Sequence, residues 1–198
     1  EIKKSNNDYF NNEILKIRKI SWKINKIKIF TEKNLNDEIL KFSNNGEQIF
    51  SIIKNYKLQK LLNDKLKKSK FINFKSIISY KKIVNQGYKL IINCNSNHQI
   101  TKKYFSKKIE KNYNSYAYTL IIKHKKIIDN NTAFQNFTNN GPIAFLPISE
   151  TQTSVVYSYK GKNEKNSFDI KNLIKKYNPI YSIIKINDYN CFKLRSSH

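Results

Sequence analysis

The chain has 198 residues, a formal net charge of +24 and only 4 Gly, 3 Pro and 2 Cys, which suits one ordinary domain and excludes collagen-like and disulfide-rich classes. Hydrophobic residues make up 39% and aromatic residues 13%, enough for a core and too many for general disorder. No apolar run approaches the roughly 20 residues of a membrane span, and no apolar signal segment follows Glu1, so we expect a soluble, cytoplasmic chain.

Lysine, asparagine and isoleucine dominate the chain, with 36, 29 and 31 residues, whereas arginine occurs only twice. Arginine reads phosphates and guanines through paired hydrogen bonds, so its scarcity argues against a nucleic-acid partner. Codons rich in adenine and thymine encode all three abundant residues, and we interpret the positive charge as the result of an AT-rich genome. A non-enzymatic basic module that binds nucleic acid or an anionic membrane surface is the alternative. Because the chain contains no Met, we expect a segment of a longer or processed reading frame.

Residues 1–110 predict a mixture of helices and strands. The clearest helix is 55–69, in which four leucines recur at steps of three and four. Alternation over 24–30 predicts a strand that pairs with 38–42, and 44–46 reads as a turn. The other predicted segments are a helix over 9–20, strands over 71–84 and 88–92 joined by a turn at 85–87, and a short helix over 101–110.

From residue 116 onward the pattern becomes a series of short strands separated by polar turns. Strands are predicted over 116–122, 132–137, 143–148 and 153–159. A helix over 168–177 follows, for which Asp169 is the expected cap, and strands over 181–186 and 191–194 come last. Helices beside a largely antiparallel or mixed sheet make this an α+β fold.

The residues offer no catalytic signature. The sequence lacks GxGxxG, GxxxxGK(S/T), GxSxG and HExxH patterns, and glycine stands only at positions 46, 87, 141 and 161. Acidic residues are sparse and indicate no catalytic carboxylate pair, so the catalytic residues are unknown. Cys94, Cys191 and the three histidines lack metal-ligand spacing, and we predict no metal site.

Residues 131–148 differ in composition from the rest of the chain. They contain two of the three prolines, two of the three alanines and Gly141. In a chain biased toward Lys, Asn and Ile, the retention of these residues indicates a constraint on backbone shape. The stretch is either a hairpin with edge-strand prolines or a sheet wall that a ligand approaches closely.

The same stretch carries a family resemblance. NTAFQNFTNNGPIAFLPISETQTSVVYS (131–158) resembles the part of the ubiquinone-biosynthesis FAD-dependent hydroxylases that has the pattern TA-aromatic-x-x-F, then GP-x-A-x-LPL, then S-I/V-V. Weaker matches flank it at 20–27, around Trp22, and at 50–62, which resembles the family's helix entry. LIINCNSNH (90–98) stands where the family has LLVGADGxxS, and 192–195 resembles its F/Y-P-L segment.

The resemblance implies the substrate-sheet part of a para-hydroxybenzoate-hydroxylase-like fold. In such enzymes FAD, reduced by NAD(P)H, lies between a dinucleotide-binding domain and a sheet that covers the substrate, and the flavin hydroxylates an aromatic ring. The implied substrate is an aromatic, prenylated precursor of ubiquinone, met at the inner face of the membrane or in a quinone-biosynthesis complex. The chain is then a single segment, in which 1–110 adjoins an FAD-binding region and 111–198 covers the substrate.

The resemblance also implies site residues. The strand that faces flavin and substrate contains Gly141, Pro142, Ala144, Leu146 and Pro147. Asn95 and Ser96 occupy the family's Asp-Gly position and are the implied, degenerate cofactor-binding residues. The GxGxxG and GDAAH motifs that contact FAD in the family are absent, so we expect a fragment or a degenerate copy of the enzyme.

Overall fold

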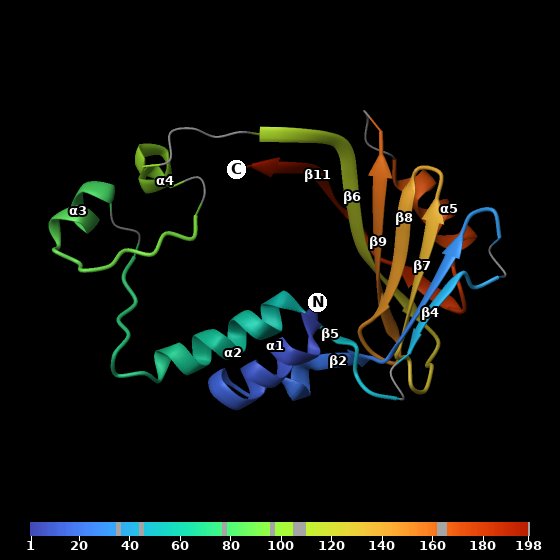
Figure 1. Ribbon diagram of the computed structural model, residues 1–198, viewed down its shortest axis with the longest axis horizontal. Coiled ribbons are helices and arrows are strands. Elements are labelled where there is room, and N and C mark those ends of the chain that lie inside the picture. The colour runs from blue at the N-terminus through green and yellow to red at the C-terminus, as the bar shows by residue number, and fades with distance from the viewer. Residues whose placement is uncertain are drawn as a thin grey trace.

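The computed structural model describes residues 1–34, 37–43, 46–76, 79–95, 98–104, 110–161 and 166–197. Two β-sheets and several short helices form an α+β fold, as the sequence predicts (Figure 1). The larger sheet contains β3 (Lys26–Thr31), β4 (Leu40–Ser43), β6 (Glu110–His124), β7 (Thr132–Thr138), β8 (Gly141–Pro147), β9 (Gln152–Lys160), β10 (Ile183–Ile186) and β11 (Asn190–Ser197). The smaller sheet contains β1 (Ile2–Lys3), β2 (Ser21–Ile24) and β5 (Phe50–Ile53).

The larger sheet is mixed. Its strands follow the order β10-β6-β9-β8-β7-β3-β4, and β11 also pairs with β6. β3 and β7 run parallel, whereas every other described pair is antiparallel. Because β3 and β4 belong to this sheet, it draws strands from both 1–110 and 111–198.

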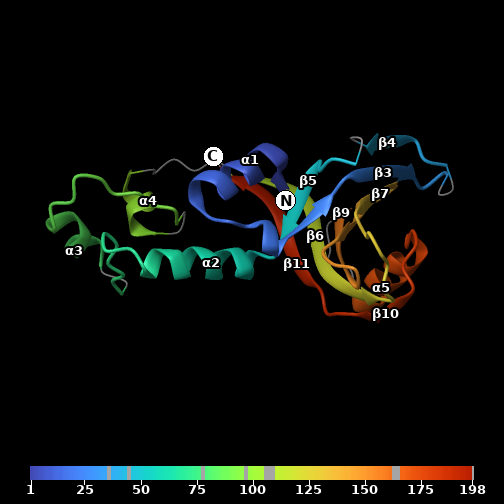
Figure 2. The ribbon, with the colours of Figure 1, turned by 90° about the horizontal axis from the view of Figure 1, so that it is seen from below.

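The helices are short. They are α1 (Lys4–Tyr9), α2 (Asn55–Lys67), α3 (Tyr80–Asn85), α4 (Gln99–Tyr104) and α5 (Ser167–Lys176). Of these, α3 and α4 lie apart from the larger sheet (Figure 1). Figure 2 shows α5 and β10 on one side of β6 and the N-terminal helices on the other. In Figure 1, α2 leads away from the larger sheet toward α3 and α4. None of the helices in the described ranges has the length and apolar composition that a bilayer span requires.

Alternating burial along the strands places every second side chain in the core. Ile143 and Phe145 on β8 and Val155 on β9 are fully buried on the side that α5 covers. α5 contributes Ile170 and Ile174 to the same cluster. Burying each such side chain stabilises the fold by about 1.5–3 kcal/mol. We call this side of the sheet the inner face and the opposite side the outer face.

A single residue, Asn25, separates β2 from β3 and therefore joins the two sheets. The Asn25 backbone N–H donates to the Asn131 carbonyl (3.1 Å), and the Trp22 indole N–H donates to the Asn130 carbonyl (2.6 Å). Asn130 is buried, and its side-chain amide donates to the Ser149 carbonyl (2.9 Å). These bonds hold one end of the larger sheet against the smaller sheet.

Several predicted elements are confirmed. α2 matches the helix predicted over 55–69, and β4 pairs with β3 as expected for 38–42. β6, β7, β8 and β9 correspond to the four strands predicted between 116 and 159, although β8 ends at Pro147, one residue before the predicted end. Of the predicted turn at 44–46, the structure describes Gly46, which has φ +79°, while 44–45 lie outside the described residues.

Other predicted elements are wrong. Within the described residues 71–76 and 79–95 no strand forms, and α3 occupies part of the predicted strand. Isoleucine and phenylalanine favour strands only where neighbouring strands cover them, and Phe71 is 96% exposed. The helix predicted over 9–20 is divided into the end of α1, a π-helical turn at Phe10–Ile14 and a 3₁₀ turn at Arg18–Ile20. The helix predicted over 101–110 corresponds to α4, which lies at Gln99–Tyr104.

Candidate functional site

β8, the strand on which the sequence places the site, lies in the middle of the larger sheet between β7 and β9. The interpretation of its prolines as edge-strand residues is therefore wrong. Pro142 and Pro147 stand near the two ends of β8, where a missing N–H interrupts the ladder least. Each proline fixes its backbone φ near about −65° where the strand begins or ends.

The pleat of β8 divides the predicted residues between two faces. Pro142, Ala144 and Leu146 are half-buried and lie on the outer face. Pro147 is fully buried and belongs to the same side as Ile143 and Phe145. A ligand on the outer face would therefore contact Pro142, Ala144 and Leu146, whereas Pro147 affects the site only through the path of the backbone.

The outer face around these residues is uncharged over four neighbouring strands. Ala144 pairs with Gln135 on β7 and with Val156 on β9, so these side chains share one row. On the same strands, the nearest outward charges are Lys123 and Lys160, at the two ends. We call the central outward residues that are not buried the outer patch: Ala117, Thr119, Ile121, Gln135, Phe137, Pro142, Ala144, Leu146, Ser154, Val156 and Ser158.

Small side chains and the absence of charge suit the outer patch to a flat ring. Charged residues make up 26% of the chain, so an uncharged surface across four strands stands out from the rest. The half-buried alanine and serine side chains leave the backbone accessible to a close neighbour, and Leu146, Ile121 and Phe137 add apolar area.

Gly141, at the start of β8, is constrained by the adjacent strand. Its φ is +125°, a region that L-residues rarely adopt, and an added Cβ would lie 2.0 Å from the Ser158 carbonyl oxygen. The Thr138 hydroxyl donates to the Gly141 carbonyl (2.6 Å) and closes the turn from β7. The close approach that requires a glycine here is thus between β8 and β9.

Asn95 lies far from β8 along the molecule. It follows an irregular segment between α3 and α4, which Figure 1 shows on the side opposite the larger sheet. Its carbonyl accepts hydrogen bonds from the Thr101 hydroxyl (2.8 Å) and the Asn93 amide (3.2 Å), and its side chain is exposed. The structure therefore does not bring Asn95 to the outer patch, and Ser96 lies outside the described residues.

A charged cluster on the inner side of the sheet ties β3 to α5. Glu32 accepts hydrogen bonds from the Tyr177 hydroxyl, the Lys176 ammonium (2.9 Å) and the Asn139 backbone N–H (2.8 Å). The bond from Tyr177, followed by the other two donors, lowers the pKa of the Glu32 carboxyl to about 2. Burial, together with the bond to Glu32, raises the pKa of Tyr177. The cluster keeps its charges at neutral pH and holds α5 in place.

A pocket of about 670 Å³ lies at the joint between the sheets, where the sequence predicts no site. Residues that line it include Trp22, Asn25, Gln48, Asp129, Asn131 and Glu150. Asn25 Oδ1 and Gln48 Nε2 are buried there without a hydrogen-bond partner among the described residues. Sequence patterns could not single out Asn25 among 29 asparagines.

The described residues fit one end of a flavin dinucleotide. The outer patch offers a neutral surface for the ring. A pyrophosphate needs a glycine-rich turn between a strand and a helix, but α1 follows β1 directly and that junction contains no glycine. Ring contacts are therefore what the described part of this chain can supply to FAD.

No protein-family model matches the chain. The curated protein "Ubiquinone biosynthesis monooxygenase COQ6, mitochondrial" of Xenopus tropicalis is 42% identical over 50 residues, which are 25% of this chain and 11% of that protein. Among solved structures, the tetracycline destructase Tet(51) is similar over 100% of this chain and 59% of its own, with a TM-score of 0.52 and 12% identity. CmlS, a flavin-dependent halogenase, is similar over 90% of this chain and 38% of its own, with a TM-score of 0.57 and 12% identity.

These similarities show that the chain has the fold of part of CmlS and of part of Tet(51). Because the sequence predicts an α+β segment of a flavin-enzyme fold, these two structural similarities confirm the predicted fold. The COQ6 match agrees with the resemblance of the sequence to ubiquinone-biosynthesis hydroxylases. The chain spans about three fifths of Tet(51) and less of the other two proteins.

Proposed function

We propose that the chain is the substrate-sheet part of a flavin-dependent hydroxylase that acts on an aromatic ring, present as a fragment or a degenerate copy. The observation that carries this proposal is the outer patch, an uncharged sheet surface centred on Ala144 and Val156. The similarity to a flavin-dependent enzyme and the short COQ6 match support it.

The residues of this chain would position and shield the reactants. FAD, when bound and reduced by NAD(P)H, supplies the oxygen chemistry that side chains lack. Ala144 and Ser154 leave room for a ring to lie close to the sheet, and Leu146 and Ile121 exclude water around it. None of these side chains is an acid or a base that ionises near neutral pH, so we assign no catalytic residue.

We propose a prenylated precursor of ubiquinone as the substrate. An isoprenoid tail is apolar, and Phe137 (46% exposed) with Leu146 offers apolar area on the outer face beside the ring position. The name of the COQ6 protein supports this substrate class, since it is a ubiquinone biosynthesis monooxygenase.

A flavin titration tests the proposal. Riboflavin is the first probe because it presents the ring without phosphates, and FAD is the second. We expect saturable quenching of flavin fluorescence, with affinity lowered at least about tenfold in Ala144→Lys, because that ammonium would have to be desolvated under the ring. Asn172→Lys, which adds the same charge on the exposed surface of α5, is the control and keeps wild-type affinity. Absent or non-saturable quenching, or equal effects of both substitutions, would contradict the proposal.

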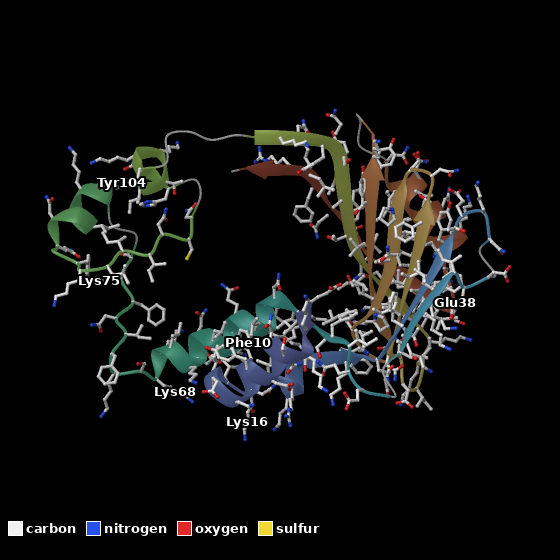
Figure 3. All side chains as sticks on the ribbon, viewed as in Figure 1. Phe10, Lys16, Glu38, Lys68, Lys75 and Tyr104 are labelled. Carbon is white, nitrogen blue, oxygen red and sulfur yellow. The ribbon has the colours of Figure 1, made fainter. Side chains whose placement is uncertain are left out.

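We propose a second role for residues 54–104, which we call the basic arm: contact with an anionic membrane. The arm contains thirteen lysines and one acidic residue, Asp64. It also exposes apolar side chains, including Phe71 at 96% and Ile92 at 78%. Lysines attract anionic headgroups while exposed apolar side chains enter the interface. Figure 3 shows Lys68, Lys75 and Tyr104 along this arm, at the opposite end of the molecule from Glu38.

Co-sedimentation with vesicles tests the second role. We expect binding to vesicles that contain phosphatidylserine and little binding to pure phosphatidylcholine, with a steep loss as salt increases. Replacing Phe71 and Ile92 by Ser should weaken the binding that remains at high salt. Equal binding to both vesicle types, or affinity independent of salt, would exclude the membrane contact. Salt-sensitive binding to nucleic acid but not to vesicles would favour the alternative basic module.

A further inference from the structure

We propose that the outer face of β3 and β4 binds the isoprenoid tail of the substrate. The inference rests on the proposed function, because it takes the substrate ring to lie on the outer patch. It extends the apolar area beside the ring position to the edge of the larger sheet. It begins with the pairing of β3 and β4, which determines the side of the sheet that receives their apolar side chains.

The apolar side chains of these two strands lie together on the outer face. Ile27 pairs with Phe42, and two residues further along β3, Ile29 pairs with Leu40. The four side chains therefore form two successive cross-strand pairs on one face. Ile29 is also in register with Gln135, an outer-patch residue of β7, which places the group on the outer face. Leu40 is 53% exposed and Phe42 is 48% exposed.

The lysines of the two strands lie on the inner face. Lys28 pairs with Lys41 and is in register with Phe134 on β7. Lys28 and Phe134 line a cavity of about 410 Å³ beside the end of α5, which confirms the side on which they lie. A sheet that is covered on one side ordinarily turns its apolar side chains toward the core and its charges toward water. On β4 the lysine faces the side of α5, so the exposed Leu40 and Phe42 indicate a separate apolar binding surface.

A continuous row of side chains connects this group to the ring position. Its members are in register on six neighbouring strands: Thr119, Val156, Ala144, Gln135, Ile29 and Leu40. From Ala144 to Leu40 the row crosses three strand spacings, a distance of about 14 Å. The side chains are small or polar around Ala144 and become large and apolar from Ile29 onward. The row thus offers a ring position followed by a surface for a short hydrocarbon chain.

The lack of charge on this surface favours an isoprenoid tail as its occupant. The outward residues of β3 and β4 are uncharged: Ile27, Ile29, Thr31, Leu40 and Phe42. An isoprenoid tail is an uncharged hydrocarbon, which binds by removing apolar area from water and needs no hydrogen-bond partner. A second copy of this chain is a poorer occupant, because each copy carries a net charge of +24 and the two would repel each other.

Calorimetric titration of the full chain with three phenols tests the assignment. The probes are 2-methylphenol, 2-prenylphenol and 2-geranylphenol, which share the ring and carry tails of increasing length. We expect at least about tenfold tighter binding of 2-geranylphenol than of 2-methylphenol, with 2-prenylphenol between them. In Leu40→Asn this gain should fall by at least about fivefold, whereas 2-methylphenol binds as to the wild type because the ring position is unchanged. Leu40→Ala, a milder change on the same strand, should lose a smaller part of the gain.

The control is Ile184→Asn, which removes an exposed isoleucine (69%) from β10, at the opposite edge of the same sheet. It keeps the wild-type gain. The proposal is overturned if the three phenols bind equally, if Leu40→Asn keeps the gain, or if Ile184→Asn loses as much. It is also overturned if sedimentation shows a wild-type dimer that Leu40→Asn dissociates, because a second copy then covers the row.

The riboflavin titration separates failure of this inference from failure of the proposed function. Riboflavin binding that is weakened by Ala144→Lys, without any gain from the tail, upholds the proposed function and overturns only the tail site. A gain from the tail that Leu40→Asn removes, without riboflavin binding, supports the tail site and contradicts the flavin role.

Discussion

Close contacts fix the residue type at particular positions of this chain, although its overall composition is biased toward Lys, Asn and Ile. Gly141 has a Ser158 carbonyl where a Cβ would be, and Glu32 collects three donors from α5 and the turn after β7. Gly141 packs β8 against β9, and Glu32 joins the end of β3 to the end of α5. The stability that each residue contributes can be measured separately.

Replacing Gly141 by alanine should destabilise the fold by about 3 kcal/mol or more, because the backbone would be strained at φ +125° and the methyl would collide with a carbonyl. Urea unfolding followed by circular dichroism measures the change. Gly87→Ala is the matched control, since Gly87 also has positive φ (+66°) but nothing within 4 Å of the added Cβ. It should cost only about 1 kcal/mol. Equal costs at the two positions would refute the argument from the Ser158 contact.

The Glu32 carboxyl predicts a loss of stability in acid. Its pKa is lowered to about 2 in the folded protein from the ordinary 4.5, so its ionised form stabilises the fold above pH 4.5 and that contribution disappears as pH falls toward 2. Glu32→Gln should be less stable than wild type by about 1 kcal/mol at pH 6, a value kept small by solvent screening, and nearly equal to it at pH 2. Urea unfolding at several pH values measures this convergence, with Glu13→Gln, on an exposed turn, as the control. A difference that persists unchanged at pH 2 would show that Glu32 acts without its charge.

At the scale of elements, the structure separates strands that bury a face from segments that only have strand-like composition. The alternation in 116–159 predicts its strands correctly because α5 and the neighbouring strands cover one face. Residues 71–92 are richer still in isoleucine and phenylalanine, but among the described residues no strand covers them. Isoleucine is abundant throughout the chain, so its presence is weak evidence for a strand.

At the N-terminus of α5, the sequence predicts the helix correctly but the wrong capping residue. The sequence predicts Asp169 as the cap, whereas the Asn166 side chain accepts from the Asp169 backbone N–H (2.9 Å), which places Asp169 in the first turn. Both residue types cap helices well, so a pattern alone does not distinguish them.

Asn166→Ala should therefore destabilise the protein by about 1 kcal/mol, through loss of the bond to the Asp169 N–H. Thermal and urea unfolding give the value. Asn172→Ala, on the exposed side of the same helix, serves as control and should be neutral or slightly stabilising, because alanine is the better helix former. If the control loses as much stability as Asn166→Ala, the capping bond is not responsible.

At the scale of the whole molecule, the +24 charge opposes compaction. Few acidic side chains are available to compensate: the chain has 14 Asp and Glu against 38 Lys and Arg. The basic arm carries thirteen lysines against one acidic residue, whereas the outer patch contains no charged residue.

Added salt should therefore stabilise the protein. Raising sodium chloride from about 20 mM to about 500 mM shortens the Debye length from about 20 Å to about 4 Å, and we expect the melting temperature to rise by several degrees. A variant with Lys67, Lys68 and Lys70 changed to Gln should show a smaller rise, because less repulsion is left to screen. A melting temperature that falls with salt would mean that attractive ion pairs outweigh the repulsion.

The sequence predicts the fold class, the central strands and the β8 segment, because hydrophobic alternation and a retained family pattern both survive the compositional bias. It does not predict which side chains of β8 face outward, since that depends on where α5 packs. The sequence also does not predict the pocket at the joint between the sheets, for a different reason. Its lining residues come from segments far apart in the sequence, and polar residues are too common in this chain to single out the ones that meet there.

The single-residue link at Asn25 also has a mechanical consequence. Because β2 continues into β3 after one residue, the two sheets cannot slide past each other along the strand direction, and the freedom left to them is a swivel about the line of these strands. The bonds from Trp22 and Asn25 to the 130–131 loop act as a stop on that rotation. Force applied between the smaller sheet and β7 would thus load β3 along its length, in shear against its parallel partner, so the bonds of that pair would have to break together.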